Sequence, residues 1–191
     1  ALSNKGYSLE VKKNYKFSKV LVIYHFYTKD LDENLLNSKN RIKIAKNSEL
    51  HILDFIVNDS KNNFFNNICE EIILKETAIL KSIYLQSHKS SGYFHKYSKS
   101  RISSGSNLTS FIFPTGLKFS KLDLEFDLEG EKSECNIQSA SFLDDNEHQE
   151  IKTRVNHFYP NCRSYQKVKN VLNLKSKGVY QGKIFVKDVA Q

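Results

Sequence analysis

The 191-residue sequence has little of several residues that mark particular protein classes: 3 Cys, 2 Pro, 7 Gly, and no Met or Trp. The low Gly and Pro content excludes a collagen-like or low-complexity chain. Three widely spaced cysteines without a CxxC pair exclude a disulfide scaffold and a zinc ribbon, and favour a reducing compartment. The longest uninterrupted apolar run, Val20 to Tyr24, is too short to cross a membrane. What remains is an ordinary globular composition of about one domain.

The N-terminal residues show no basic segment followed by an apolar core, so we expect no signal peptide and read the sequence as beginning partway through a longer chain. The net charge of +8 comes mostly from lysine and is unevenly distributed. Residues 122–150 are acidic, whereas residues 152–191 are basic. Nucleic-acid readers depend on arginine forks, so electrostatic nucleic-acid binding through residues 152–191 is the weakest of the functions considered.

Strand patterns dominate the sequence. Residues 20–27 are β-branched and aromatic, and Leu122 to Glu129 alternates strictly between apolar and acidic residues. Residues 59–75 are ambiguous, because Phe64, Ile68 and Ile72 fall four apart and suit an amphipathic helix when counted alone.

A repeated turn organises the chain. Ser48, Thr77, Ser106 and Ser133 each follow a polar turn and precede an apolar residue by two positions, at separations of 29, 29 and 27 residues. Such a period predicts stacked units, each with two strands, in a β-solenoid with coils of about 28 residues. A β-sandwich is the alternative, although its turns recur every 8 to 12 residues or so. The solenoid predicts a strand just before Thr77, whereas the four-residue spacing of Phe64, Ile68 and Ile72 predicts a helix there.

The repeat also predicts a ladder of inward-facing side chains. Leu50, Ile79, Leu108 and Cys135 hold the same place in four successive units. We therefore expect these four residues to stack on one another inside the solenoid, one per coil.

Two late segments carry a resemblance to a known family. The segment from Thr153 to Ser164 reads TRVNHFYPNCRS, the segment from Leu174 to Val186 reads LKSKGVYQGKIFV, and the chain ends with Ala190-Gln191. This pattern resembles the SufB/SufD family of the SUF iron-sulfur cluster assembly system, and within it SufD. Tyr180 stands where the family has Phe. Upstream, the turns at residues 47–50 and 76–79 and the DLEGE segment at residues 127–131 also look like the family.

The resemblance implies an all-β fold, a right-handed parallel β-helix, and a noncatalytic scaffold subunit of a cytoplasmic SUF complex. It implies a SufB-like partner that pairs along the β-helix and a SufC-like ATPase that docks on terminal helices. We expect residues 1–191 to be a single β-helix core domain, with the family's N-terminal helical segment and C-terminal SufC-binding region absent from this chain. We expect self-association of this fragment, no membrane contact, and no cofactor of its own, the nascent cluster being handled by the full complex.

Six side chains could ligate a metal: Cys69, Cys135, Cys162, His95, His148 and His157. No two of them are closer than five residues. Cys135 falls on the predicted ladder and Cys69 lies between isoleucines, so both are expected in the core. His157 and Cys162 bracket Pro160, where a structural histidine beside a bend is favoured over a shared ligand site. We therefore assign no metal residues.

The remaining candidates are acidic residues and glycines. Asp123, Glu125, Asp127 and Glu129 share one face of a strand, about 6.6–7 Å apart in succession, a spacing compatible with inverting glycoside hydrolysis. A carbohydrate-active β-helix enzyme is therefore the alternative function, although a solvated strand face is favoured. Gly178 and Gly182 lack the pattern of a phosphate loop and are expected at a corner of the coil. No catalytic residue is assigned, since the sequence has no nucleophile elbow.

Overall fold

The chain is built almost entirely of β-strands. The computed structural model describes residues 5–28, 35–58, 63–87 and 90–190. In that part, thirteen strands are followed by one short 3-10 helix, η1 (Asp188–Ala190). The strands are β1 (Ser8–Val11), β2 (Lys16–Tyr27), β3 (Leu35–Ile44), β4 (Glu49–Asn58), β5 (Phe65–Leu74), β6 (Ile79–Ser87), β7 (Ser90–Ile102), β8 (Asn107–Phe113), β9 (Leu117–Leu128), β10 (Glu134–Leu143), β11 (His148–His157), β12 (Arg163–Leu172) and β13 (Lys177–Val186).

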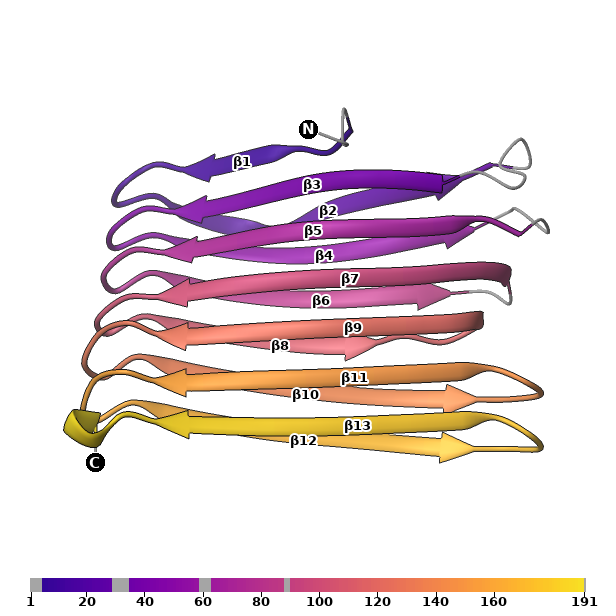
Figure 1. The fold of residues 1–191 in the computed structure, drawn as a ribbon. Helices are drawn as coiled ribbons and strands as arrows, with labels where there is room; N and C mark the ends of the chain where they lie inside the picture. Colours follow the sequence, from indigo (N-terminus) through magenta and orange to yellow (C-terminus); the bar gives the residue numbers. More distant parts are fainter. Residues whose placement is uncertain (1–4, 29–34, 59–62, 88–89, 191) are drawn as a thin grey trace.

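The strands form two parallel sheets that face each other. The first sheet has the order β1-β3-β5-β7-β9-β11-β13 and the second the order β12-β10-β8-β6-β4-β2. The chain alternates between the sheets, so each coil contributes one strand to each (Figure 1). The path winds in the right-handed sense through about six turns of about 29 residues (Figure 1). The predicted all-β, right-handed parallel β-helix is confirmed.

Alternation along each strand sends every second side chain inward. On β9, Leu122, Leu124 and Phe126 are buried inside the solenoid, while Asp123 and Glu125 lie on its outer face. The apolar core consists of such inward residues stacked coil upon coil. No helix in the described ranges is long and apolar enough to span a lipid bilayer.

The predicted inward ladder is correct at three of its four positions. Leu50, Leu108 and Cys135 are 1–2% exposed. The rung between Leu50 and Leu108 is Leu80, which pairs with both and is fully buried. The prediction of Ile79 was wrong: this residue pairs with Glu49 and remains half-buried.

The error arises because the coils differ in length. Thr77 has a φ of 55° and occupies the left-handed turn position that Asn47 holds in the preceding coil at 59°. Ala78, and not Thr77, therefore holds the position equivalent to Ser48. The true equivalent lies one residue after the hydroxyl residue that the sequence pattern selects.

Buried turn serines join consecutive coils. Ser48 Oγ donates to the Lys12 carbonyl at 2.7 Å and accepts from the Tyr15 N–H at 3.2 Å. Ser106 Oγ repeats this arrangement with Lys75 and Ala78. At these two turns the hydroxyl is thus explained by the backbone groups that it satisfies.

The ambiguous segment 59–75 contains a strand, as the repeat predicts. Residues 59–62 lie outside the described part of the chain. Phe65–Leu74 forms β5 and pairs with β3 and β7 on its two sides. The helical spacing counted from Phe64, Ile68 and Ile72 was misleading, because those positions also satisfy the two-residue period of a strand. Pairing with neighbouring coils decides between the two.

Candidate functional site

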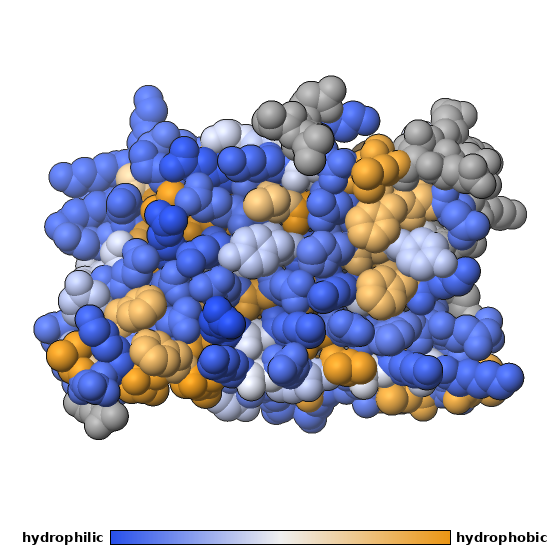
Figure 2. Space-filling model, in the orientation of Figure 1, coloured by the Kyte–Doolittle hydropathy of each residue, from blue (hydrophilic) through white to orange (hydrophobic). Residues whose placement is uncertain are grey.

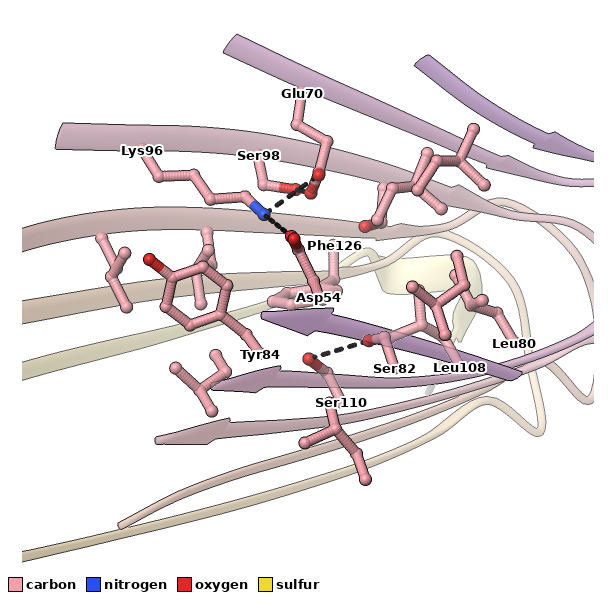
Figure 3. A pocket seen from close by; sticks show the side chains of 18 of the residues that line it. Asp54, Glu70, Leu80, Ser82, Tyr84, Lys96, Ser98, Leu108, Ser110 and Phe126 are labelled. Carbon is pink, nitrogen blue, oxygen red and sulfur yellow. Dashed lines mark hydrogen bonds and ion pairs between the residues drawn. The ribbon is translucent and has the colours of Figure 1, made fainter. Parts of the chain in front are cut away.

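A cluster of charged side chains lies inside the solenoid. Lys96 of β7, Glu70 of β5 and Asp54 of β4 all occupy inward positions and are 5–9% exposed. Lys96 Nζ lies 3.0 Å from Glu70 Oε1 and 3.9 Å from Asp54 Oδ2 (Figure 3). Ser98 Oγ donates to Glu70 Oε2 at 2.9 Å, and His25 Nε2 lies 2.6 Å from Asp54 Oδ1. These five side chains form the buried polar cluster.

The cluster keeps its charges despite burial. Burial alone lowers the pKa of Lys96, but the charges of Glu70 and Asp54 outweigh it and hold this pKa above its usual value. Burial alone raises the pKa of Asp54, but the hydrogen bond from His25 and the charge of Lys96 outweigh it, so this pKa is lowered. Lys96 is therefore an ammonium and Asp54 a carboxylate at neutral pH.

A cavity of about 60 Å³ adjoins the cluster. Four serine side chains line it, and Figure 3 shows Ser98 beside Glu70 and the hydrogen-bonded pair Ser82 and Ser110 nearer Tyr84. Burial raises the pKa of Tyr84 well above its usual value, so its hydroxyl stays neutral. A water needs about 10–15 Å³ of such space, so this volume has room for a few water molecules and is too small for an organic substrate of ordinary size.

The cluster extends toward the N-terminal end of the solenoid. Tyr7 lines both the interior cavity and a larger pocket of about 430 Å³ at that end. His25, Tyr27 and Asn66 line the larger pocket, and Asn66 donates a hydrogen bond to the Tyr27 hydroxyl. Since His25 also contacts Asp54, it connects this pocket to the buried charges.

The three cysteines occupy different environments. Cys135 is 2% exposed, as predicted, and burial raises the pKa of its thiol. The prediction for Cys69 was wrong, because this residue is exposed. Its neighbours Ile68 and Glu70 point inward, so the alternation of β5 turns Cys69 outward. Cys162 Sγ donates to the Gly130 carbonyl at 3.2 Å.

The histidines have polar partners of their own. His157 Nε2 lies 2.9 Å from Ser164 Oγ, and burial lowers its pKa. Cys162 contacts a different group, so these two side chains share no site in the described structure. His95 lies between Asn67 and Asp123, while His148 packs edge-on against a phenylalanine ring. Within the described ranges, no group of three or more His, Cys, Asp or Glu side chains is placed to hold a metal ion.

Three members of the acidic row contact Lys99 or His95 rather than lying free. Glu125 and Asp127 both lie within 3.2 Å of Lys99 Nζ, and Asp123 lies 3.0 Å from His95. Asp127 is only 5% exposed, so the prediction of a solvated strand face is correct for only part of the row. Glu129 is exposed but lies beyond the end of β9. A carboxylate that shares one lysine with another carboxylate is poorly suited to act as a free general base.

The two late glycines lie within a strand, so the prediction of a coil corner was wrong. Gly178 and Gly182 belong to β13 and pair with the inward residues Gln149 and Thr153. A Cβ on Gly182 would lie 2.8 Å from the Tyr180 hydroxyl. Their role is to leave space for inward side chains of the last coil.

The late segments that carry the sequence resemblance fold into the end of β11, the start of β12 and β13. Thr153 of β11 and Tyr180 of β13 both donate to Gln166 Oε1 of β12, which joins the three strands. Comparison with family models agrees: residues 26–191 match the SufBD core domain of the SUF system for FeS cluster assembly. The chain belongs to the SufBD core family. No curated protein matches it.

Membership of the SufBD core family indicates a role in SUF iron-sulfur cluster assembly, in a system of several subunits. The family match does not account for the buried polar cluster, which the sequence analysis also missed. A signal was present, because Lys96 and Glu70 stand at the inward positions of strands whose flanking inward residues are apolar or small. Applying the two-residue period to charged residues would have identified it.

Proposed function

We propose that this chain is a noncatalytic, SufD-like scaffold subunit of a cytoplasmic SUF complex. The match of residues 26–191 to the SufBD core domain carries the proposal. The SufD-like late segments support the finer assignment. The pairing of the acidic row with Lys99 and His95 argues against the carbohydrate-active alternative.

Exposed apolar side chains at the β12–β13 end of the described solenoid support a pairing role. β12 and β13 are terminal strands of their sheets within the described part, so each presents one unpaired edge. Ile184 of β13 pairs with the fully buried Val155 and is itself 58% exposed. Unpaired edges and exposed apolar rungs are surfaces that another chain can cover. We propose that a SufB-like subunit pairs here, that a SufC-like ATPase docks on helical segments outside the core, and that the nascent cluster is cargo.

Size-exclusion chromatography with light scattering tests this proposal. The chain alone is expected to self-associate, and an added SufB-like subunit to convert it into a heterodimer. Ile184→Lys places a charge on the exposed apolar surface at the β12–β13 end and is expected to prevent both associations. Phe65→Lys is the matched control, because Phe65 is 39% exposed on the outer face of the first sheet, away from this end. A strictly monomeric chain that ignores the SufB-like subunit but captures the SufC-like ATPase would contradict the proposal.

A further inference from the structure

The two outer faces of the solenoid differ in chemistry. The outer face of the first sheet is crossed by ion pairs between neighbouring strands, and Figure 2 shows it as hydrophilic except for smaller apolar patches, one of them at the strand starts around Leu35 and Phe65. On the outer face of the second sheet, the described ion pairs are His51–Glu49 and Arg163–Glu134, near the starts of their strands. In the middle of the second face, the described residues form no ion pair.

That middle region is apolar across four strands. Two rows of aligned side chains cross β2, β4, β6 and β8, and we call them the apolar columns. Tyr24 is 56% exposed, Ile83 42% and Phe111 36%, so water reaches both columns. The columns are Val22–Leu53–Ile83–Phe111 and Tyr24–Phe55–Leu85–Phe113.

We propose that the apolar columns dock an amphipathic α-helix of a partner protein, with carboxylates flanking the apolar stripe of that helix. A contiguous exposed apolar patch of this kind on a soluble domain marks an interaction site. This surface lies on the flank of the solenoid, separate from the β12–β13 end invoked for the scaffold role. The proposal therefore stands independently of that role.

An added β-strand does not fit this surface. Strands β4, β6 and β8 are each paired on both sides within the second sheet, so their backbone groups are already used. Only side-chain packing can hold an occupant over them, which a helix provides with its apolar stripe.

The size of the patch favours a helix over a second copy of the chain. Four strands about 4.8 Å apart give each column a length of roughly 15 Å, and the two columns lie about 6.6–7 Å apart along the strands. This is a few hundred Å² at most, whereas a stable dimer interface takes about 800 Å² from each partner. A helix is about 10–12 Å wide and rises about 16 Å in three turns, which matches the patch.

The surrounding charges determine the chemistry of the helix flanks. Lys81 is exposed two positions from Ile83 on the same face of β6. Lys167 and Lys169 are exposed on β12, where Lys167 aligns with Gln138, the partner of Phe111. None of the three lysines forms an ion pair with a described residue. Carboxylates beside the apolar stripe would complement Lys81, and carboxylates near one end of the helix would complement Lys167 and Lys169.

The test uses a fluorescein-labelled, 18-residue helical peptide with leucines on one face and glutamates on both flanks. Its binding to the chain is followed by fluorescence anisotropy, beside the same peptide with lysines in place of the glutamates. We expect saturable 1:1 binding of the acidic peptide and at least tenfold weaker binding of the basic one. Phe111→Lys should weaken binding of the acidic peptide at least tenfold, whereas Phe65→Lys, at similar exposure on the first sheet, should leave it unchanged.

The role of charge is tested separately with Lys81→Glu. This change should weaken binding of the acidic peptide and strengthen binding of the basic peptide. Circular dichroism of each variant confirms that the solenoid is intact. The proposal is overturned if the acidic peptide does not bind, or if Phe111→Lys and Phe65→Lys bind it equally. It is also overturned if the apolar columns instead bury a second copy, so that Phe111→Lys alone turns a dimer into a monomer.

Discussion

Lys96 Nζ lies 3.0 Å from Glu70 Oε1 inside the solenoid, although one full coil of sequence separates the two residues. Together with Asp54, the pair places three charged groups where apolar side chains fill most other inward positions. Buried charges are costly unless each is compensated, so the three groups depend on one another.

Replacing one member of this cluster should destabilise the fold strongly. Lys96→Met leaves Glu70 and Asp54 buried without their cation, which costs about 3–5 kcal/mol. Urea unfolding followed by circular dichroism measures the loss. The triple variant with Glu70→Gln and Asp54→Asn removes all three charges and should recover much of the stability. Equal losses in the single and triple variants would show that the charges do not compensate each other.

The same cluster predicts loss of stability at both ends of the pH range. The pKa of Asp54 is lowered from 3.8, so its contribution is complete above that pH and is lost as the pH falls through the lowered pKa. The pKa of Lys96 is raised from 10.5, so its contribution is complete below that pH and is lost as the pH rises through the raised pKa. Melting temperatures between pH 2 and 12 test this, and Asp54→Asn should flatten the acid side alone.

The core ladder with Leu80 as its rung predicts that truncating two adjacent residues lowers the free energy of unfolding by different amounts. Leu80→Ala removes a fully buried rung between Leu50 and Leu108 and should cost about 2–5 kcal/mol. Ile79→Ala affects a half-buried outward residue and should cost clearly less. Denaturant unfolding of both variants compares them directly. A larger loss for Ile79 would restore the uncorrected register.

The cysteines should differ in reactivity with a thiol reagent at pH 8. Cys69 is exposed and should react first, whereas burial and a raised pKa keep the Cys135 thiol protonated and inaccessible until unfolding. Labelling followed by mass spectrometry identifies the order. Cys69→Ser should abolish the fast phase, and a fast phase that survives this change would contradict the outward placement.

We expect the isolated chain to hold no stoichiometric iron-sulfur cluster after anaerobic reconstitution. Cluster ligands are thiolates, but the Cys135 thiol stays protonated and the Cys162 thiol donates to a backbone carbonyl. Absorption spectroscopy and iron analysis provide the measurement. A cluster that disappears on Cys162→Ser or His157→Ala would overturn this expectation.

The amino-acid sequence by itself determined the class of fold and the family. The recurring turn hydroxyls predicted a coil close to the observed length, because Ser48 and Ser106 satisfy the same backbone groups in different coils. The strict alternation of residues 122–126 predicted which side chains of β9 are buried. Both signals are local, since turn geometry and the two-residue period act within a few residues.

The tertiary structure decided everything that depends on how coils stack. Coils of unequal length shifted the ladder from Ile79 to Leu80, and pairing on both sides of β5 overrode a helical count and turned Cys69 outward. The cluster of Lys96 and Glu70 and the apolar columns likewise join residues from different coils. Their alignment follows from the hydrogen-bonded register between parallel strands, which no single stretch of the sequence contains.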